Sequence, residues 1–156
     1  MTSVLARRTF RDRAVPEAVE AVHAELDGLW DDAPFVPDMD RMTFATAVIE
    51  AATNVVQHAV PESAAPVELG VDISVRQSSL TATISAFGAA HPELHGTEVG
   101  MPAEDAESGR GLALIRALVT TVTFTRQDGT NIWVLSRDAT PKLPGGPGDK
   151  LGGLGL

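Results

Sequence analysis

The stretch TFATAVIEAATNVVQHA, residues 43–59, decides the fold of this chain, because its spacing predicts one long helix. At about 100° per residue, apolar side chains gather on one side of this helix and small polar side chains on the other. The polar side consists of Thr43, Thr46, Glu50, Thr53, Asn54, Gln57 and His58. Solvated helix faces are usually rich in Lys, Arg and Glu, so a single carboxylate among hydroxyls and amides predicts the wall of a functional site. A plain amphipathic helix whose polar side meets water is the alternative.

The length and composition of the chain predict one domain without covalent cross-links. The 156 residues include no cysteine, which excludes disulfides, thiolate chemistry and cysteine-ligated metal sites. The first 13 residues, MTSVLARRTFRDR, contain no apolar signal segment, and no run is long enough to cross a bilayer. We therefore expect a soluble cytoplasmic protein without a membrane partner.

The charge of the chain argues against a nucleic-acid partner. The formal net charge is -9, and the only lysines, Lys142 and Lys150, lie near the C-terminus. No basic stripe is available to neutralise a phosphate backbone. An acidic surface of this kind favours solubility and the steering of a basic protein surface towards it.

The remaining patterns predict an α+β fold. We expect a short strand at 4–10, a helix from Pro16 to about Trp30, a hairpin of strands 67–75 and 80–86, a helix at 112–119, and a closing hairpin around Asp128-Gly129. Strands joined as hairpins predict a two-layer sandwich, with a mixed, mostly antiparallel sheet and about three helices on one face. The domain should span residues 1–138, followed by a flexible Pro/Gly-rich tail at 139–156.

The segment at residues 87–108, FGAAHPELHGTEVGMPAEDAES, predicts a lid or binding loop, because it is long and has no period. It leads into Gly109-Arg110-Gly111, where a helix should begin. Backbone N–H groups and the helix dipole at such a start favour an anion such as phosphate. The pattern is not GxGxxG, because its sixth position is Leu114, and no P-loop is present. A purely structural helix start is therefore the alternative.

The order of these features resembles the GHKL ATPase superfamily, specifically its branch of anti-sigma factors and serine protein kinases. The resemblance covers about residues 10–137 and rests on EAATNVVQHA at 50–59, similar to the N box, and SGRGLAL at 108–114, similar to the second glycine box. It implies the Bergerat-type fold, Mg-ATP as cofactor, and partner switching in bacteria between a sigma factor and a STAS-domain anti-sigma antagonist. It also implies a homodimer, because family members are commonly dimeric.

The resemblance implies roles for individual residues. Asn54 would ligate Mg²⁺, and Glu50, one turn earlier, would be the general base that accepts the proton of a substrate serine. The second glycine box would hold the phosphates through backbone amides, with a charge clamp from its arginine; its residues are Ser108, Gly109, Arg110, Gly111 and Leu112. Gly88 remains from the first glycine box, and Thr130 resembles the threonine of the adenine-side network.

The first glycine box departs from the family pattern Asp-x-Gly-x-Gly. The aligned stretch is AFGAA at 86–90, so Ala86 replaces the aspartate that accepts the adenine amino group. A hydrogen bond to a charged group is worth about 1.5–3 kcal/mol, which is roughly 10- to 150-fold in affinity. Ser85, or a lid residue such as Asp105, could compensate for the lost acceptor. Catalysis therefore does not follow from Glu50 and Asn54 alone.

Three functions remain open at this stage. The first is an anti-sigma factor that also phosphorylates a STAS-domain antagonist, and the second is a nucleotide-independent protein-binding module of the same fold. The third, the ATP-binding half of a histidine kinase, is disfavoured because the short N-terminal segment leaves no room for a phosphoacceptor helix pair. The sequence favours an anti-sigma regulator and leaves its kinase activity undecided.

Overall fold

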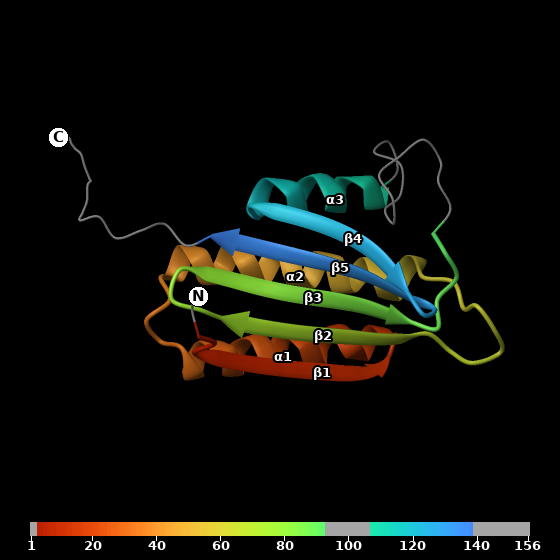
Figure 1. Ribbon diagram of the computed structural model, residues 1–156, viewed down its shortest axis with the longest axis horizontal. Helices are drawn as coiled ribbons and strands as arrows, with labels where there is room; N and C mark the ends of the chain where they lie inside the picture. Colours follow the sequence, from red (N-terminus) through yellow and green to blue (C-terminus); the bar gives the residue numbers. More distant parts are fainter. Residues whose placement is uncertain (1–2, 93–106, 139–156) are drawn as a thin grey trace.

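The computed structural model describes residues 3–92 and 107–138, and these form two layers, a five-stranded sheet and three helices (Figure 1). Along the chain the elements are β1 (Ala6–Arg13), α1 (Pro16–Asp32), α2 (Asp38–His58), β2 (Glu68–Val75), β3 (Ser79–Phe87), α3 (Glu107–Leu118), β4 (Thr121–Gln127) and β5 (Thr130–Asp138). The strand order is β1-β2-β3-β5-β4 and every neighbouring pair is antiparallel. The predicted α+β sandwich is confirmed, and its described sheet is antiparallel throughout rather than mixed.

Two predicted segments fall largely or wholly outside the described residues. Most of the expected lid lies in 93–106, and the expected tail is 139–156. Within the described residues, no helix is long and apolar enough to span a membrane.

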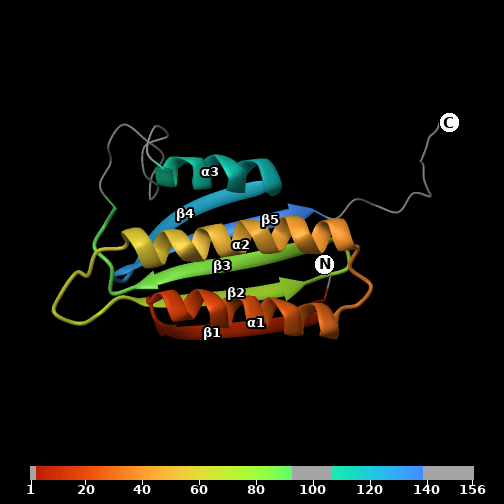
Figure 2. The ribbon, with the colours of Figure 1, turned by 180° about the vertical axis from the view of Figure 1, so that it is seen from behind.

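Helices α1 and α2 lie side by side on one face of the sheet (Figure 2). Helix α1 begins with Pro16, whose fixed φ suits the first turn, and ends at Asp32, close to the predicted end. Helix α2 begins at Asp38, which the sequence predicted as its N-cap residue, and the N-cap itself is Pro37, one residue earlier. Its sheet side is fully buried and consists of Phe44, Ala47, Val48, Ala51, Ala52 and Val55.

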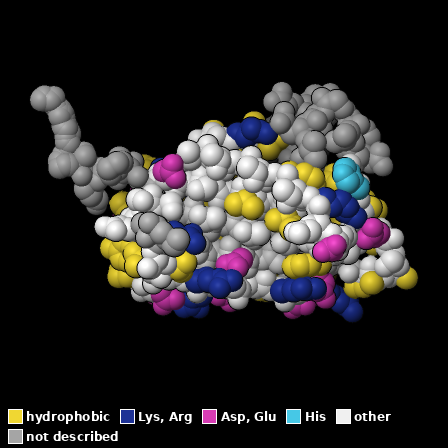
Figure 3. Space-filling view, viewed as in Figure 1, with side chains coloured by type: hydrophobic (Ala, Val, Ile, Leu, Met, Phe, Trp, Pro, Cys, Tyr) yellow, Lys and Arg dark blue, Asp and Glu magenta, His cyan; other side chains and the backbone are white. Residues whose placement is uncertain are grey.

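Strand β1 is longer than the sequence predicted. Residues 11–13, read from the sequence as a turn, continue the strand and pair with the start of β2. Ion pairs across the two strands explain this extension: Arg7 donates to Asp72 at 2.6 and 2.9 Å, and Arg11 donates to Glu68 at 2.7 Å. Figure 3 shows Lys/Arg and Asp/Glu side chains gathered along the β1 side of the sheet, whereas the middle of the same face is mostly uncharged. The weak apolar alternation of β1 is thus offset by paired charges.

Two local features fix the ends of β3 and β5. The predicted hairpin turn is confirmed, with φ of 52° at Asp128 and 75° at Gly129, the positive values that a tight two-residue hairpin requires. Phe87, at the end of β3, packs on the outer face over Gly70, where a Cβ would lie 2.5 Å from the ring. The guanidinium carbon of Arg11 lies 3.6 Å from the centroid of the same ring. Phe87 is therefore held on the face away from the helices, which turns Ala86 towards them.

A nearly buried ion pair joins three elements at the other end of the sheet. Asp40, in the first turn of α2, accepts a hydrogen bond from Nε of Arg137 of β5 at 3.0 Å, and Nη2 of Arg137 lies 2.9 Å from the same oxygen in an ion pair. Arg137 also donates to the backbone oxygen of Leu118 at 2.9 Å, at the end of α3. The Asp40 side chain is 8% exposed and that of Arg137 is 22% exposed. One guanidinium therefore fixes the start of α2 relative to the end of α3.

Replacement of Asp40 should cost more stability than replacement of an exposed aspartate. We expect Asp40→Asn to lower the free energy of unfolding by about 2–4 kcal/mol, because it leaves Arg137 largely buried without its counter-ion. The measurement is equilibrium urea unfolding. Asp72→Asn, which breaks the exposed pair with Arg7, is the control and should cost less than about 1 kcal/mol. Equal losses in the two variants would contradict the structural role of the Asp40–Arg137 pair.

Candidate functional site

The candidate site lies where α2 and α3 face each other. Asp40, Ala47 and Asn54 are spaced by seven residues and therefore share one flank of α2. Because Arg137 bonds both Asp40 and the end of α3, this flank faces α3. Asn54 and Glu50, one turn earlier, are half-buried on or beside the flank. The two residues predicted as metal ligand and base thus lie together, beside a second helix.

The first turn of α3 contains the second glycine box. The helix begins at Glu107 rather than Leu112, so Ser108, Gly109, Arg110 and Gly111 belong to the helix itself. Helices α2 and α3 run in opposite directions, so the start of α3 lies at the same end of the molecule as the end of α2 (Figures 1 and 2). Leu112 is 2% exposed and is part of the core. The structure therefore brings the N box and the second glycine box to one end of the molecule.

Part of the polar face of α2 is satisfied within the helix. The hydroxyl of Thr43 donates to the backbone oxygen of Met39 at 2.6 Å, and that of Thr46 donates to Met42 at 2.8 Å. Gln57 is exposed to solvent. Of the polar face predicted from the sequence, the candidate site therefore includes Glu50, Thr53 and Asn54. The start of α3 lies at the same end of the molecule.

The strand position that should accept adenine is buried and apolar. Ala86 has no exposed surface and pairs with Leu69 of β2 on one side and Asn131 of β5 on the other. Ser85 lies on the opposite face of the sheet, in register with Gly70, so its hydroxyl does not replace the missing acceptor. Asp105, the other residue considered for compensation, lies outside the described residues.

The backbone explains which glycine of the first box remains. Gly88 has φ of 73°, which favours glycine strongly, whereas Ala90 has no positive φ. An alanine is therefore accommodated at position 90 without backbone strain, and a side chain at position 88 would be strained. This box therefore keeps the glycine that its turn requires, at position 88, and has alanine instead of aspartate at position 86.

Residue Asn131, which the sequence reasoning missed, shares the inner face with Ala86. Thr130 pairs with Phe87 and so lies on the outer side of the sheet, one position away from the inner face. Asn131 is 3% exposed. Its amide nitrogen donates to the backbone oxygen of Ala90 at 2.9 Å, and its amide oxygen accepts from Arg126 at 2.6 Å. Asn131, rather than Thr130, is the β5 side chain beside Ala86.

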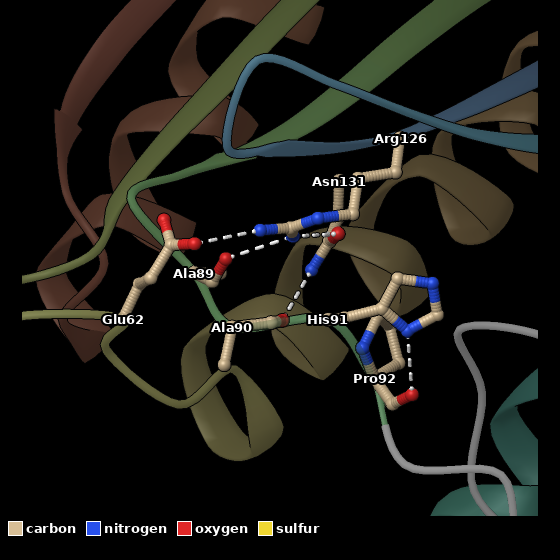
Figure 4. A network of polar contacts seen from close by, with 7 residues as sticks. All are labelled: Glu62, Ala89, Ala90, His91, Pro92, Arg126 and Asn131. Atoms are coloured by element: carbon tan, nitrogen blue, oxygen red, sulfur yellow. Dashed lines mark hydrogen bonds and ion pairs between the residues drawn. The ribbon is translucent and has the colours of Figure 1, made fainter.

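Arg126 completes a cluster that we call the Arg126 clasp, formed by Arg126, Asn131 and Glu62 around the backbone oxygens of Ala89 and Ala90 (Figure 4). Its guanidinium donates to the oxygen of Ala89 at 2.9 Å and to the Glu62 carboxylate at 3.0 Å. The clasp therefore joins the segment after β3 to β4, β5 and the loop after α2. No local pattern in the sequence signals it, because the residues are brought together by strand register.

Backbone hydrogen bonds hold the same segment from the other side. The N–H of Ala90 donates to the oxygen of Val60 at 2.7 Å, and the N–H of Glu62 donates to the oxygen of Gly88 at 2.8 Å. The N–H of Gly88 donates to the oxygen of Gly129 at 3.2 Å. Residues 88–90 are thus fixed by main-chain and side-chain bonds without any ligand.

The two halves of the site differ in how well they fit Mg-ATP. At the phosphate end, Asn54 offers an amide oxygen of the kind Mg²⁺ accepts, and the start of α3 offers backbone N–H groups for phosphates. At the end where adenine would bind, Ala86 offers no acceptor, and the Asn131 amide already bonds Arg126 and Ala90. Within the part of the chain that the structure describes, the indole Nε1 of Trp133 on the same inner face is buried without a hydrogen-bond partner, but it is a donor and does not replace the missing acceptor. The residues therefore fit the phosphates better than they fit adenine.

Comparisons with known proteins agree with this geometry. The sequence profile of the histidine kinase-like ATPase domain matches residues 13–136. The crystal structure of the RsbU and RsbW domains of Rv1364c from Mycobacterium tuberculosis has a similar fold, with a TM-score of 0.58 and 19% sequence identity. That match covers 85% of this chain and 33% of the other, so this chain spans about a third of its length. No curated protein matches the sequence.

The Arg126 clasp predicts a specific effect of removing Asn131. We expect Asn131→Ala to lower the free energy of unfolding by about 1–3 kcal/mol, because the partly buried oxygen of Ala90 loses its donor. Amide exchange at Ala90 should also accelerate relative to the core of β3, as measured by hydrogen–deuterium exchange. Gln127→Ala, an exposed neighbour on β4, is the control and should change neither quantity. Unchanged exchange at Ala90 in Asn131→Ala would show that the clasp does not hold this segment.

Proposed function

This chain belongs to the histidine kinase-like ATPase domain family, and from that premise we propose that it is an anti-sigma regulatory protein acting by partner switching. In this proposal it binds a sigma factor and phosphorylates a serine of a STAS-domain anti-sigma antagonist with Mg-ATP. The observation that carries the proposal is the pairing of Glu50 and Asn54 on α2 with the glycine-rich first turn of α3. The fold likeness to a structure that contains an RsbW domain supports it.

The residues at this end suit a phosphotransfer site. Bound Mg-ATP would supply the transferable phosphoryl group, and Asn54 would hold the metal ion. The carboxylate of Glu50, half-buried on the same helix, would accept the proton of the substrate serine as its oxygen attacks phosphorus. The first turn of α3, which includes Ser108 and Gly109, would bind phosphate, because the N–H groups at a helix start have no partner within the helix and the helix dipole favours negative charge.

The proposal extends to the setting in which the protein works. A formal net charge of -9 supports protein partners rather than direct contact with nucleic acid. We place the protein in the bacterial cytoplasm, without a membrane partner, and propose a homodimer.

Two substitutions on α2 test the kinase proposal. Glu50→Gln should keep ATP affinity and slow phosphorylation of a STAS-domain protein by about 10²- to 10⁴-fold, because a general base is lost. Asn54→Ala should remove the Mg²⁺-dependent part of ATP affinity. Calorimetric titration of ATP with and without Mg²⁺ measures binding, and mass spectrometry of the STAS-domain protein measures transfer. Gln57→Ala, exposed on the same helix, is the control and should leave both unchanged.

The outcomes separate the parts of this proposal. If the unmodified protein gives no heat at about 1 mM ATP, a concentration that would still detect weak binding, the kinase proposal fails. If Glu50→Gln retains full transfer, Glu50 is not the base.

A second function, nucleotide-independent binding of a regulatory protein, is favoured by one observation. Ala86 is fully buried without an acceptor for adenine, and the neighbouring segment is already held by the Arg126 clasp. In this alternative the domain keeps its fold and its protein contacts and has lost the use of ATP. It would act as a pseudokinase.

A carboxylate restored at position 86 discriminates between an ATP-dependent kinase and a nucleotide-independent binding module. We expect Ala86→Asp to raise ATP affinity by roughly 10- to 150-fold, the value of a charged hydrogen bond to the adenine amino group. Ser85→Asp adds the same charge one residue away on the opposite face, so it is the control and should not raise ATP affinity. Calorimetry measures both affinities, and thermal unfolding verifies that both variants fold. If a folded Ala86→Asp variant gains no affinity, position 86 is not the adenine position.

A further inference from the structure

An exposed apolar cluster lies at the end of the molecule opposite the candidate site. Phe35 is 55% exposed, Met39 is 67% exposed and Met42 is 65% exposed, and all three lie within the connector from α1 to α2 and the first turns of α2. We call these three residues the apolar triad. Single exposed apolar residues are ordinary on protein surfaces. Three large ones within eight consecutive residues form a local apolar surface.

The connector that carries Phe35 is held rigidly. The guanidinium of Arg41 donates to the backbone oxygen of Pro34 at 2.6 Å and to that of Val36 at 2.7 Å, one on each side of Phe35. The N–H of Val36 donates to the oxygen of Ala33 at 3.2 Å, and both of these side chains are buried. The fold therefore anchors the backbone around Phe35 while its ring stays exposed.

The two methionines are presented by a helix. Met39 and Met42 are three residues apart, so they lie on one side of α2, away from its buried stripe. Methionine is flexible and polarizable, which suits it to contact with varied apolar partners. A partner helix that places apolar side chains at i, i+3, i+4 and i+7 could cover such a surface.

The charge around the triad is acidic. Residues 27–42 include five aspartates and one arginine, Arg41. Asp32 is paired with Arg8, and Asp40 with Arg137. Asp31 and Asp38, both exposed, have no ion pair within the described part of the chain. Arg41 keeps its positive charge while it donates to backbone oxygens, but the five aspartates outnumber Arg41 and the two paired arginines, so the net charge next to the triad is negative.

We propose that the apolar triad is a docking surface for a basic amphipathic helix of a partner protein. The apolar side of that helix covers Phe35, Met39 and Met42, and its cations face Asp31 and Asp38. The surface lies at the start of α2, whereas Asn54 lies in the last turns of the same helix. The inference goes beyond the proposed function and does not depend on nucleotide binding.

The probe is a fluorescein-labelled peptide of about 18 residues, with leucine at i, i+3, i+4 and i+7 and lysine or arginine elsewhere. Its counterpart has glutamate in place of every cation. Fluorescence anisotropy of the full-length protein should give micromolar affinity for the basic peptide and none for the acidic one, because the net charge beside the triad is negative. Equal binding of the two peptides, or no binding of the basic one at about 1 mM protein, would overturn the proposal.

Matched variants locate the binding. Met39→Gln with Met42→Gln should weaken binding of the basic peptide about tenfold or more, as should Phe35→Ser, because central apolar contacts dominate interfaces. Val60→Thr and Leu114→Gln change exposed apolar residues elsewhere and should have no effect. If these controls weaken binding equally, the triad is not the site.

Charge variants and the oligomeric state complete the test. Asp31→Asn with Asp38→Asn should slow association and reduce its salt dependence, whereas Glu17→Gln with Glu20→Gln, on exposed positions of α1, should not. Equal effects of the two pairs of variants would show that Asp31 and Asp38 do not contribute to the docking surface.

Analytical ultracentrifugation tests whether a second copy of this chain occupies the docking surface. If the methionine variant dissociates a dimer of this chain, the triad is a self-association contact and the proposal fails.

Discussion

The close packing of α2 on the sheet is the constraint on which the rest of the structure depends. Its buried side contains Ala47, Ala51 and Ala52, each with at most 2% of its surface exposed, and Phe44 with none. Small side chains let the helix axis approach the strands, and an interior of this density does not allow the helix to rotate without opening cavities. The rotation of α2 therefore fixes the direction of Glu50 and Asn54.

Two arginines then fix the ends of the layer structure. Arg137 joins α2, α3 and β5 at one end, and Arg126 joins β4, β5 and the segment after β3 at the other. Both guanidiniums donate to backbone oxygens that no regular element satisfies, which is a use of planar, multiple donors that lysine does not match. The chain has only two lysines, both near its C-terminus, so arginine provides every such contact in the domain.

Those features that depend on local pattern were predictable, and those that depend on register were not. The apolar stripe of α2 and the Asp128-Gly129 turn are visible in the sequence because helix period and positive φ are local properties. The end of strand β1 was predicted three residues too early, because Arg11 is held by an ion pair with Glu68 of β2, more than fifty residues away along the chain. Asn131 was missed for the same reason, since its position beside Ala86 follows from the pairing of β3 with β5.

The candidate site also combines features that local sequence pattern predicts with features that depend on tertiary structure. Glu50 and Asn54 share a helix face by spacing alone, but the meeting of that face with α3 required tertiary structure. The one-residue difference between Thr130 and Asn131 decides which side of the sheet each side chain occupies, because side chains alternate along a strand. A sequence resemblance to a threonine cannot make that distinction unless the register is known.

The arrangement along α2 has a consequence for how binding events influence one another. Met42 and Asn54 are twelve residues apart on one continuous helix, which is roughly 18 Å at 1.5 Å per residue. This exceeds the Debye length of about 8 Å at physiological ionic strength, so a charged ligand beside Asn54 would be largely screened from the aspartates at the other end. Direct electrostatic coupling between the ends is therefore weak. Any communication between them has to pass through movement of α2, and the packing of its alanines on the sheet opposes such movement.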